Sequence, residues 1–201
     1  MERMINRLVD HCDPVVKALL DREVFSLDPN MNPDGSRRGH LRTNAVGATL
    51  NREWDNPTAN SSPEVLCVLE KIKTTGLAFG LDVHGDEALP YNFIAGTEGI
   101  PGWNDTRQAQ LDWYRQTLAG LNPDFQIEHG YPANSPGQAN MSYCSNSLAE
   151  RFGALVMTLE MPFKDATGTP DQIQGWSPER CAKLAHSCLD ALHLSWDRVV
   201  V

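Results

Sequence analysis

The sequence predicts a three-layer α/β/α sandwich built on a mixed, largely parallel sheet. Two nearly continuous apolar runs, at residues 77–83 and 154–160, are typical of strands that are buried on both faces of a sheet. Helical patterns with one apolar face alternate with these strands, at residues 62–73, 104–118 and 177–194. This alternation favours an α/β fold, and no internal repeat or linker divides residues 1–201, so we expect one domain.

Each further element follows from a local signal. Residues 5–12 carry apolar side chains at helical spacing, and Asp13-Pro14 is an N-cap followed by proline, which starts a second short helix. Ser62 and Ser177, each followed by Pro-Glu, start two of the helices named above. The remaining expected elements are strands at 23–27, 91–95 and 125–128 and a helix at 146–152. Polar, turn-rich segments fill 28–62 and 130–140.

The composition is that of an acidic globular protein. The formal net charge is −9, and an acidic chain repels phosphate backbones, so we expect no nucleic-acid partner. No apolar run approaches the roughly 20 residues that a membrane-spanning helix needs, so we expect no membrane partner. The five scattered cysteines form no C-x-x-C pair, which fits a reducing, cytoplasmic location.

Polar side chains that could carry chemistry follow both buried strands. His84 comes at the end of the strand at 77–83, where open α/β sheets bind ligands, and histidine is a common metal ligand. Glu160 leads into Met-Pro-Phe, where burial would raise the pKa of its carboxyl group and suit it to act as a general base. The alternatives are a loop histidine that caps the next element and a surface ion pair between Glu160 and Lys164.

A third candidate region is the polar loop at 42–54. It contains Arg42, Asn51 and Arg52, and arginine is the side chain best shaped to grip a carboxylate through two parallel hydrogen bonds. Leu50 and Trp54 would anchor Asn51 and Arg52 against an apolar surface. The alternative is an ordinary solvated loop.

These motifs occur in a characteristic order. Asn32-Pro33-Asp34-Gly35 is followed by R-T-N-A-x-G-x-x-L-N-R-E-W at 42–54, by D-x-H-G-D at 82–86 and by L-E-M-P-F-K-D at 159–165. The set resembles the zinc metallocarboxypeptidases over nearly the whole chain. It is most similar to the cytosolic carboxypeptidase branch and its bacterial relatives.

The resemblance implies a role for each candidate residue. His84 would be the third ligand of one zinc ion, and Glu160 would activate the zinc-bound water. Asn51 and Arg52 would hold the C-terminal carboxylate of the substrate, and Arg42 would polarise the scissile carbonyl and stabilise the oxyanion. The implied reaction is removal of C-terminal residues from a peptide or protein.

The sequence also departs from the family. The first two zinc ligands come from an H-x-x-E motif early in the domain, and the residues before the strand at 77–83 contain none. Residues 1–8 resemble the helix that follows the motif, so we expect a catalytic domain that is incomplete at its N-terminus. Two other hypotheses remain, an N-acyl amino acid amidohydrolase of the same superfamily and a non-catalytic module that binds C-terminal carboxylates. The family's mobile tyrosine has no secure counterpart, although Tyr143 is a possibility.

Overall fold

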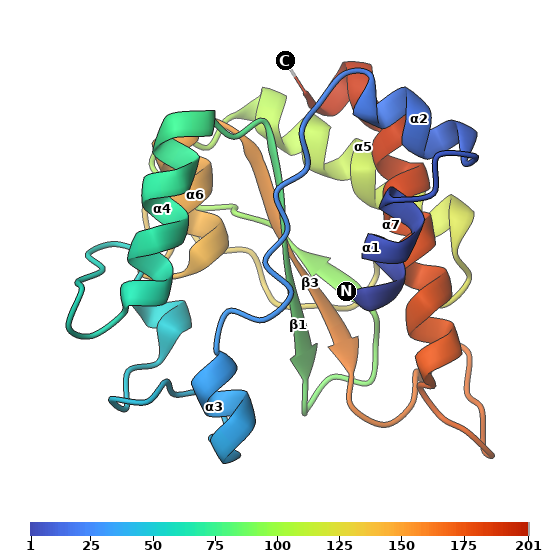
Figure 1. Ribbon diagram of the computed structural model, residues 1–201. Helices are drawn as coiled ribbons and strands as arrows, with labels where there is room; N and C mark the ends of the chain where they lie inside the picture. Colours follow the sequence, from blue (N-terminus) through green and yellow to red (C-terminus); the bar gives the residue numbers. More distant parts are fainter. Residues whose placement is uncertain (201) are drawn as a thin grey trace.

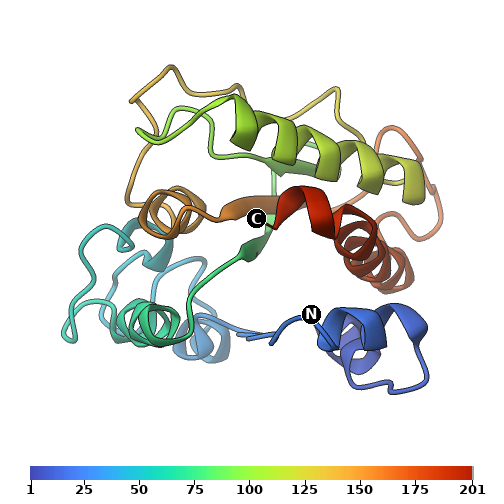
Figure 2. The ribbon, with the colours of Figure 1, turned by 90° about the horizontal axis from the view of Figure 1, so that it is seen from above.

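Residues 1–200 of the computed structural model form three layers, in which a sheet of three strands lies between helices (Figures 1 and 2). The elements in chain order are α1 (Glu2–Leu8), α2 (Pro14–Leu20), α3 (Pro33–Arg38), the short 3₁₀ helix η1 (Leu50–Arg52), α4 (Pro63–Thr75), β1 (Phe79–Asp86), β2 (Phe93–Ala95), α5 (Asp105–Leu121), α6 (Cys144–Phe152), β3 (Leu155–Pro162) and α7 (Pro178–Val199). In Figure 2, α4 and α6 lie on one side of β1 and β3, and α7 lies with α1 and α2 on the other. The predicted α/β/α architecture is confirmed.

The sheet is mixed, as predicted, with the strand order β1-β3-β2. β1 runs parallel to the central strand β3, and β2 runs antiparallel to it. Because successive side chains of a strand point to opposite faces, β3 contributes to two cores. Met157 and Leu159 pack with α5 and α7, whereas Val156 packs with α4 and α6. The apolar density that marks this strand in the sequence reflects burial on both faces.

Several predicted boundaries also agree with the structure. Asp13 caps α2 by accepting hydrogen bonds from the amides of Val15 and Val16, and Ser177 caps α7. The turn expected at Asn32 is a short helix instead, because the Asn32 side chain accepts a hydrogen bond from the Gly35 amide and so caps α3. No helix within residues 1–200 has both the length and the apolar character needed to cross a membrane. All five cysteines are free.

The prediction of a strand at 23–27 is wrong. Within the described residues, this segment forms no ladder, and the Val24 side chain is 90 % exposed. β1 is consequently an outer strand of the described sheet, and most of its side chains are half-buried, although its sequence predicted a central strand. The strand expected at 125–128 is reduced to a single bridge between Asn92 and Phe125. Apolar patterning identifies a segment with strand propensity, but a strand forms only where a partner supplies the other half of the ladder.

Candidate active site

The parallel pairing of β1 with β3 sets two predicted site residues side by side. In the register of the two strands, His84 is opposite Glu160. Glu160 comes four residues after Val156, and His84 comes four residues after Gly80, the strand partner of Val156. Because side chains alternate along a strand, both point to the face that α6 covers. A histidine and a carboxylate thus meet where the two strands end.

His84 is held by the aspartate two residues before it. Its Nε2 atom lies 2.9 Å from Oδ2 of Asp82, which is close enough for an ion pair. The two groups are not aligned for a hydrogen bond. Burial disfavours the charged imidazole, but the carboxylates of Asp82 and Glu160 outweigh it and raise the pKa of His84 above its ordinary value. The Nδ1 atom has no hydrogen-bond partner within residues 1–200, so it is the nitrogen available to a ligand.

Glu160 is buried, with 6 % of its surface exposed, and its Oε2 atom has no hydrogen-bond partner among the described residues. Burial raises the pKa of its carboxyl group to about 7, and His84 only partly offsets this effect. No ion pair joins it to Lys164 within residues 1–200, so the surface-pair alternative is wrong. A carboxyl group with this pKa can take a proton and return it near neutral pH.

Tyr131 is a third member of this cluster, and no sequence pattern predicted it. Its hydroxyl donates to Oδ2 of Asp86 and lies 3.4 Å from Oε1 of Glu160. The other oxygen of Asp86 accepts hydrogen bonds from the amides of Ala88 and Leu89, both at 2.6 Å. Burial opposes the charge on Asp86, but these hydrogen bonds outweigh it and lower the pKa of Asp86. No sequence motif surrounds Tyr131, so it is recognised as part of the site only from its contacts with Asp86 and Glu160.

Asn51 and Arg52 lie in η1, against the start of α6. The Oδ1 atom of Asn51 accepts a hydrogen bond from the Cys144 amide at 2.9 Å, and the guanidinium of Arg52 lies over the Tyr143 ring. The positive charge of Arg52 tends to lower the pKa of His84. Leu50 and Trp54 are buried, which confirms the predicted anchoring of this turn.

Arg42 stands apart from these contacts. Its side chain is exposed and makes no hydrogen bond or ion pair within the described part of the chain. The backbone around it is nevertheless fixed, because Thr43 pairs with Thr49 and the buried Asn44 side chain accepts hydrogen bonds from the amides of Val46 and Ala48. The structure therefore holds the loop that carries Arg42 but does not join its side chain to His84 or Glu160.

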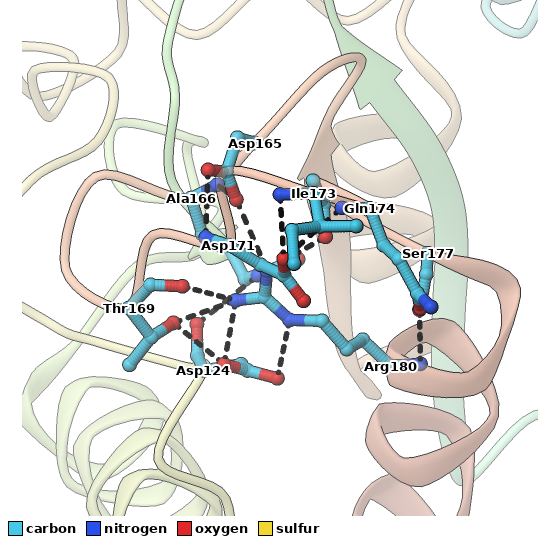
Figure 3. Close-up of polar contacts among 11 residues, drawn as sticks. Asp124, Asp165, Ala166, Thr169, Asp171, Ile173, Gln174, Ser177 and Arg180 are labelled. Atoms are coloured by element: carbon cyan, nitrogen blue, oxygen red, sulfur yellow. Dashed lines mark hydrogen bonds and ion pairs between the residues drawn. The ribbon is translucent and has the colours of Figure 1, made fainter.

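The loop that follows β3 is fastened by Arg180, as Figure 3 shows. Arg180 donates two hydrogen bonds to Asp124, at 3.1 and 2.8 Å, and one to Asp165 at 3.0 Å. It also donates to the backbone carbonyls of Thr169 and Gly175. The hydrogen bonds to Arg180 and Thr169 lower the pKa of Asp124 despite partial burial. This network joins α7 to the loop that follows Glu160 along the chain, so it helps to hold the end of β3 in place.

The described residues do not make a complete metal centre. No group of three histidine, cysteine, aspartate or glutamate side chains within residues 1–200 is arranged to hold a metal ion. One H-x-x-E spacing occurs in the chain, at His84 and Glu87, but Glu87 is exposed in the turn after β1. A catalytic zinc usually takes three protein ligands. His84 can supply one of them, and the described residues do not provide the set.

Comparison with known proteins identifies the family, although no family model matches the sequence. The structure superposes with a TM-score of 0.95 on a metallo-carboxypeptidase from Pseudomonas aeruginosa in complex with (2-guanidinoethylmercapto)succinic acid. The two sequences are 41 % identical over 99 % of this chain and 53 % of the other. The chain belongs to the metallocarboxypeptidase family. A protein of Zymomonas mobilis is 52 % identical to it over 192 residues, which are 96 % of this chain and 50 % of that protein.

The likeness to the cytosolic branch of the metallocarboxypeptidases is more local. Cytosolic carboxypeptidase 1 of Danio rerio is 33 % identical over 91 residues, which are 42 % of this chain and 8 % of that protein. This chain thus spans about half the length of the Zymomonas relative and of the Pseudomonas structure. The expectation that part of the catalytic domain lies outside these residues is consistent with that share.

Proposed function

We propose that the protein containing this chain is a zinc-dependent carboxypeptidase that hydrolyses the C-terminal peptide bond of peptides or proteins. The observation that carries the proposal is the pairing of His84 with Glu160 at the ends of β1 and β3. The Oε2 atom of Glu160 is buried without a hydrogen-bond partner in the described chain, a state that is costly unless a ligand or water uses it. Relatives of this family that are named carboxypeptidases support the same reaction class.

Glu160 carries the proton transfer in this proposal. With a pKa of about 7, its carboxylate takes a proton from the attacking water and delivers it to the amine that leaves. The Tyr131 hydroxyl, which donates to Asp86, lies 3.4 Å from Oε1 of Glu160 and would help to orient this oxygen. Zinc, when bound by His84 together with ligands from outside these 201 residues, would supply the Lewis acid that polarises the water and the carbonyl.

In this proposal, the loop at 42–54 binds the substrate. Arg52, with Asn51, binds the terminal carboxylate, because a guanidinium can donate two parallel hydrogen bonds to it. Arg42, whose exposed side chain has no competing partner within residues 1–200, would stabilise the oxygen on which negative charge develops. The proposed location is the cytoplasm, which the five free cysteines and the names of the cytosolic relatives support.

One observation favours a second function, recognition of a C-terminal carboxylate without catalysis. The described residues lack a group of three metal ligands, while Arg52 and Asn51 are in place. Retention of a buried Glu160 argues against this function, because a binding module has no use for a general base. The amidohydrolase alternative has no such observation in its favour.

The test uses the longest protein that contains this chain, assayed with a short peptide after reconstitution with zinc. Glu160→Gln should lower kcat by about 10²–10⁴-fold and leave zinc binding unchanged, since it removes only the proton acceptor. Glu70→Gln, which changes an exposed carboxylate on α4 that pairs with Lys73, is the matched control and should keep full activity. Unchanged turnover in Glu160→Gln would refute the mechanism. Peptide binding that persists without zinc, together with no turnover in the unaltered protein, would support the binding module.

A further inference from the structure

The side chain of Tyr143 makes a close contact with Arg52. The guanidinium carbon of Arg52 lies 3.9 Å from the centre of the Tyr143 ring. A cation is attracted to the face of an aromatic ring at this distance. Arg52 itself is exposed, whereas Tyr143 is half-buried where α6 begins, so the ring is the fixed partner of the pair.

Three further contacts fasten the turn that carries Arg52 to the start of α6. The Cys144 amide donates to Oδ1 of Asn51 at 2.9 Å, and the Trp54 amide donates to the Ser142 carbonyl at 3.1 Å. The Ser147 hydroxyl donates to the Trp54 carbonyl at 2.9 Å. η1 and the first turn of α6 therefore form one support, and Tyr143 extends that support to the guanidinium.

The stack leaves the edge of the guanidinium open. The Nη1 atom donates one hydrogen bond to the Asn51 carbonyl at 2.6 Å, and the Arg52 side chain makes no other hydrogen bond or ion pair within residues 1–200. Stacking uses the flat face of the group, whereas a carboxylate is gripped by the N–H groups in its plane. Contact with the ring and binding of a carboxylate can therefore occur together.

We propose that Tyr143 is a positioning residue, which holds the Arg52 guanidinium with its free edge toward the terminal carboxylate of a peptide. The inference rests on the proposed function, because it takes Arg52 as the group that binds this carboxylate. Without the ring, Arg52 would sample many rotamers, and ordering it would cost part of the binding free energy. Tyr143 thus acts through Arg52 and not on the reacting atoms.

Tighter binding after removal of the ring would contradict this role. If the substrate had to draw Arg52 off the ring, the stack would compete with binding. Removing the ring would then tighten the complex.

The experiment measures calorimetrically how the 201-residue chain binds an acetylated peptide with a free C-terminal carboxylate, and the same peptide as its C-terminal amide. Tyr143→Leu should weaken binding of the carboxylate peptide by about two- to fivefold, the range expected from an exposed cation–π contact, and should leave the amide unchanged. Tyr143→Phe keeps the ring face and should bind like the unaltered chain. Circular dichroism checks that each variant is folded.

A second aromatic–arginine stack provides the matched control. Arg198 lies over the Trp113 ring at 3.8 Å, where α7 ends, at the opposite end of the sheet from the site in Figure 1. Trp113→Leu removes a similar contact and should leave peptide binding unchanged.

The possible failures are distinguishable. If the unaltered chain does not prefer the carboxylate peptide to the amide, the proposed carboxylate recognition is wrong, and the inference fails with it. If the preference is present but Tyr143→Leu binds as well or more tightly, the positioning role alone is wrong. A loss in Tyr143→Phe equal to that in Tyr143→Leu would assign the effect to the hydroxyl and would also overturn the proposal.

Discussion

Replacing Arg180 with leucine should destabilise the protein by about 2–3 kcal/mol, between the small cost of breaking a surface ion pair and the larger cost of removing one partner from a fully buried one. The Arg180 side chain is 12 % exposed, and that of its partner Asp124 is 13 % exposed. Leucine preserves the aliphatic packing but leaves the Asp124 carboxylate with the Thr169 hydroxyl as its remaining side-chain donor. Asp165 also loses its arginine, at a smaller cost because it is more exposed.

Urea unfolding followed by circular dichroism at pH 7 measures this loss, provided that the dependence of stability on urea is the same in both proteins. Arg180→Lys should recover only part of it, because lysine keeps the charge but not the planar fork that spans both oxygens of Asp124. The control is Arg22→Leu. Its ion pair with Asp197 joins side chains that are 51 % and 87 % exposed, so we expect almost no change.

The pH dependence gives an independent check. The pKa of Asp124 is lower in the folded protein than in the unfolded chain, chiefly because of its hydrogen bond with Arg180. The stabilisation is therefore fully present above the unfolded pKa and is lost as the pH falls through the folded value. The difference between the unaltered protein and Arg180→Leu should shrink as the solution is acidified. A loss below about 1 kcal/mol at pH 7, or a difference that grows on acidification, would refute the reasoning.

Two further predictions concern the core and the site. Met157 has no exposed surface in the central strand, so Met157→Ala should lower the free energy of unfolding in urea by about 2–5 kcal/mol. The control is Ile173→Ala, which changes a side chain that is 94 % exposed and should alter stability by less than about 0.5 kcal/mol. In the metal-free chain, the folded pKa of Glu160 is about 7 and its ordinary value is 4.5, so its contribution to stability is fully present below the ordinary value and is lost as the pH rises through the folded one. Glu160→Gln should therefore become more stable relative to the unaltered chain between pH 5 and pH 8. A constant difference over that range would mean that the pKa of Glu160 is not raised in the folded chain.

Much of the fold can be predicted because its central strand and the helices around it have clear apolar patterns in the sequence. The strand at 154–160 carries apolar side chains on both faces, and in a chain with flanking amphipathic helices this pattern is typical of a central strand. The parallel pairing then follows from the helices between the strands, and it brings His84 opposite Glu160. A carboxylate and a histidine that each end a buried strand are therefore good candidates from the sequence alone.

The features that sequence reasoning missed depend on a single distant partner. Residues 23–27 have the composition of a strand, but no other described strand pairs with them. Tyr131 and Tyr143 both lie in loops without a periodic pattern, so nothing in the sequence shows that the first reaches Glu160 and the second stacks on Arg52. Tyr143 is a possible counterpart of the family's mobile tyrosine, and in this structure its ring lies against the Arg52 guanidinium. Whether it has that role stays a prediction. The position of Arg42 is equally unpredictable, because an exposed arginine side chain is fixed only by what it binds.

The outer position of β1 has a consequence for the behaviour of the chain in solution. A strand edge without a partner exposes backbone groups that can pair with another copy, and this is a common route to aggregation. The net charge of −9 opposes such pairing, because copies of the chain repel one another. This repulsion is electrostatic, so it weakens as the pH approaches the pI near 5.0 and as salt is added. Acidic pH and high salt should therefore favour association of the chain through the free edge of β1.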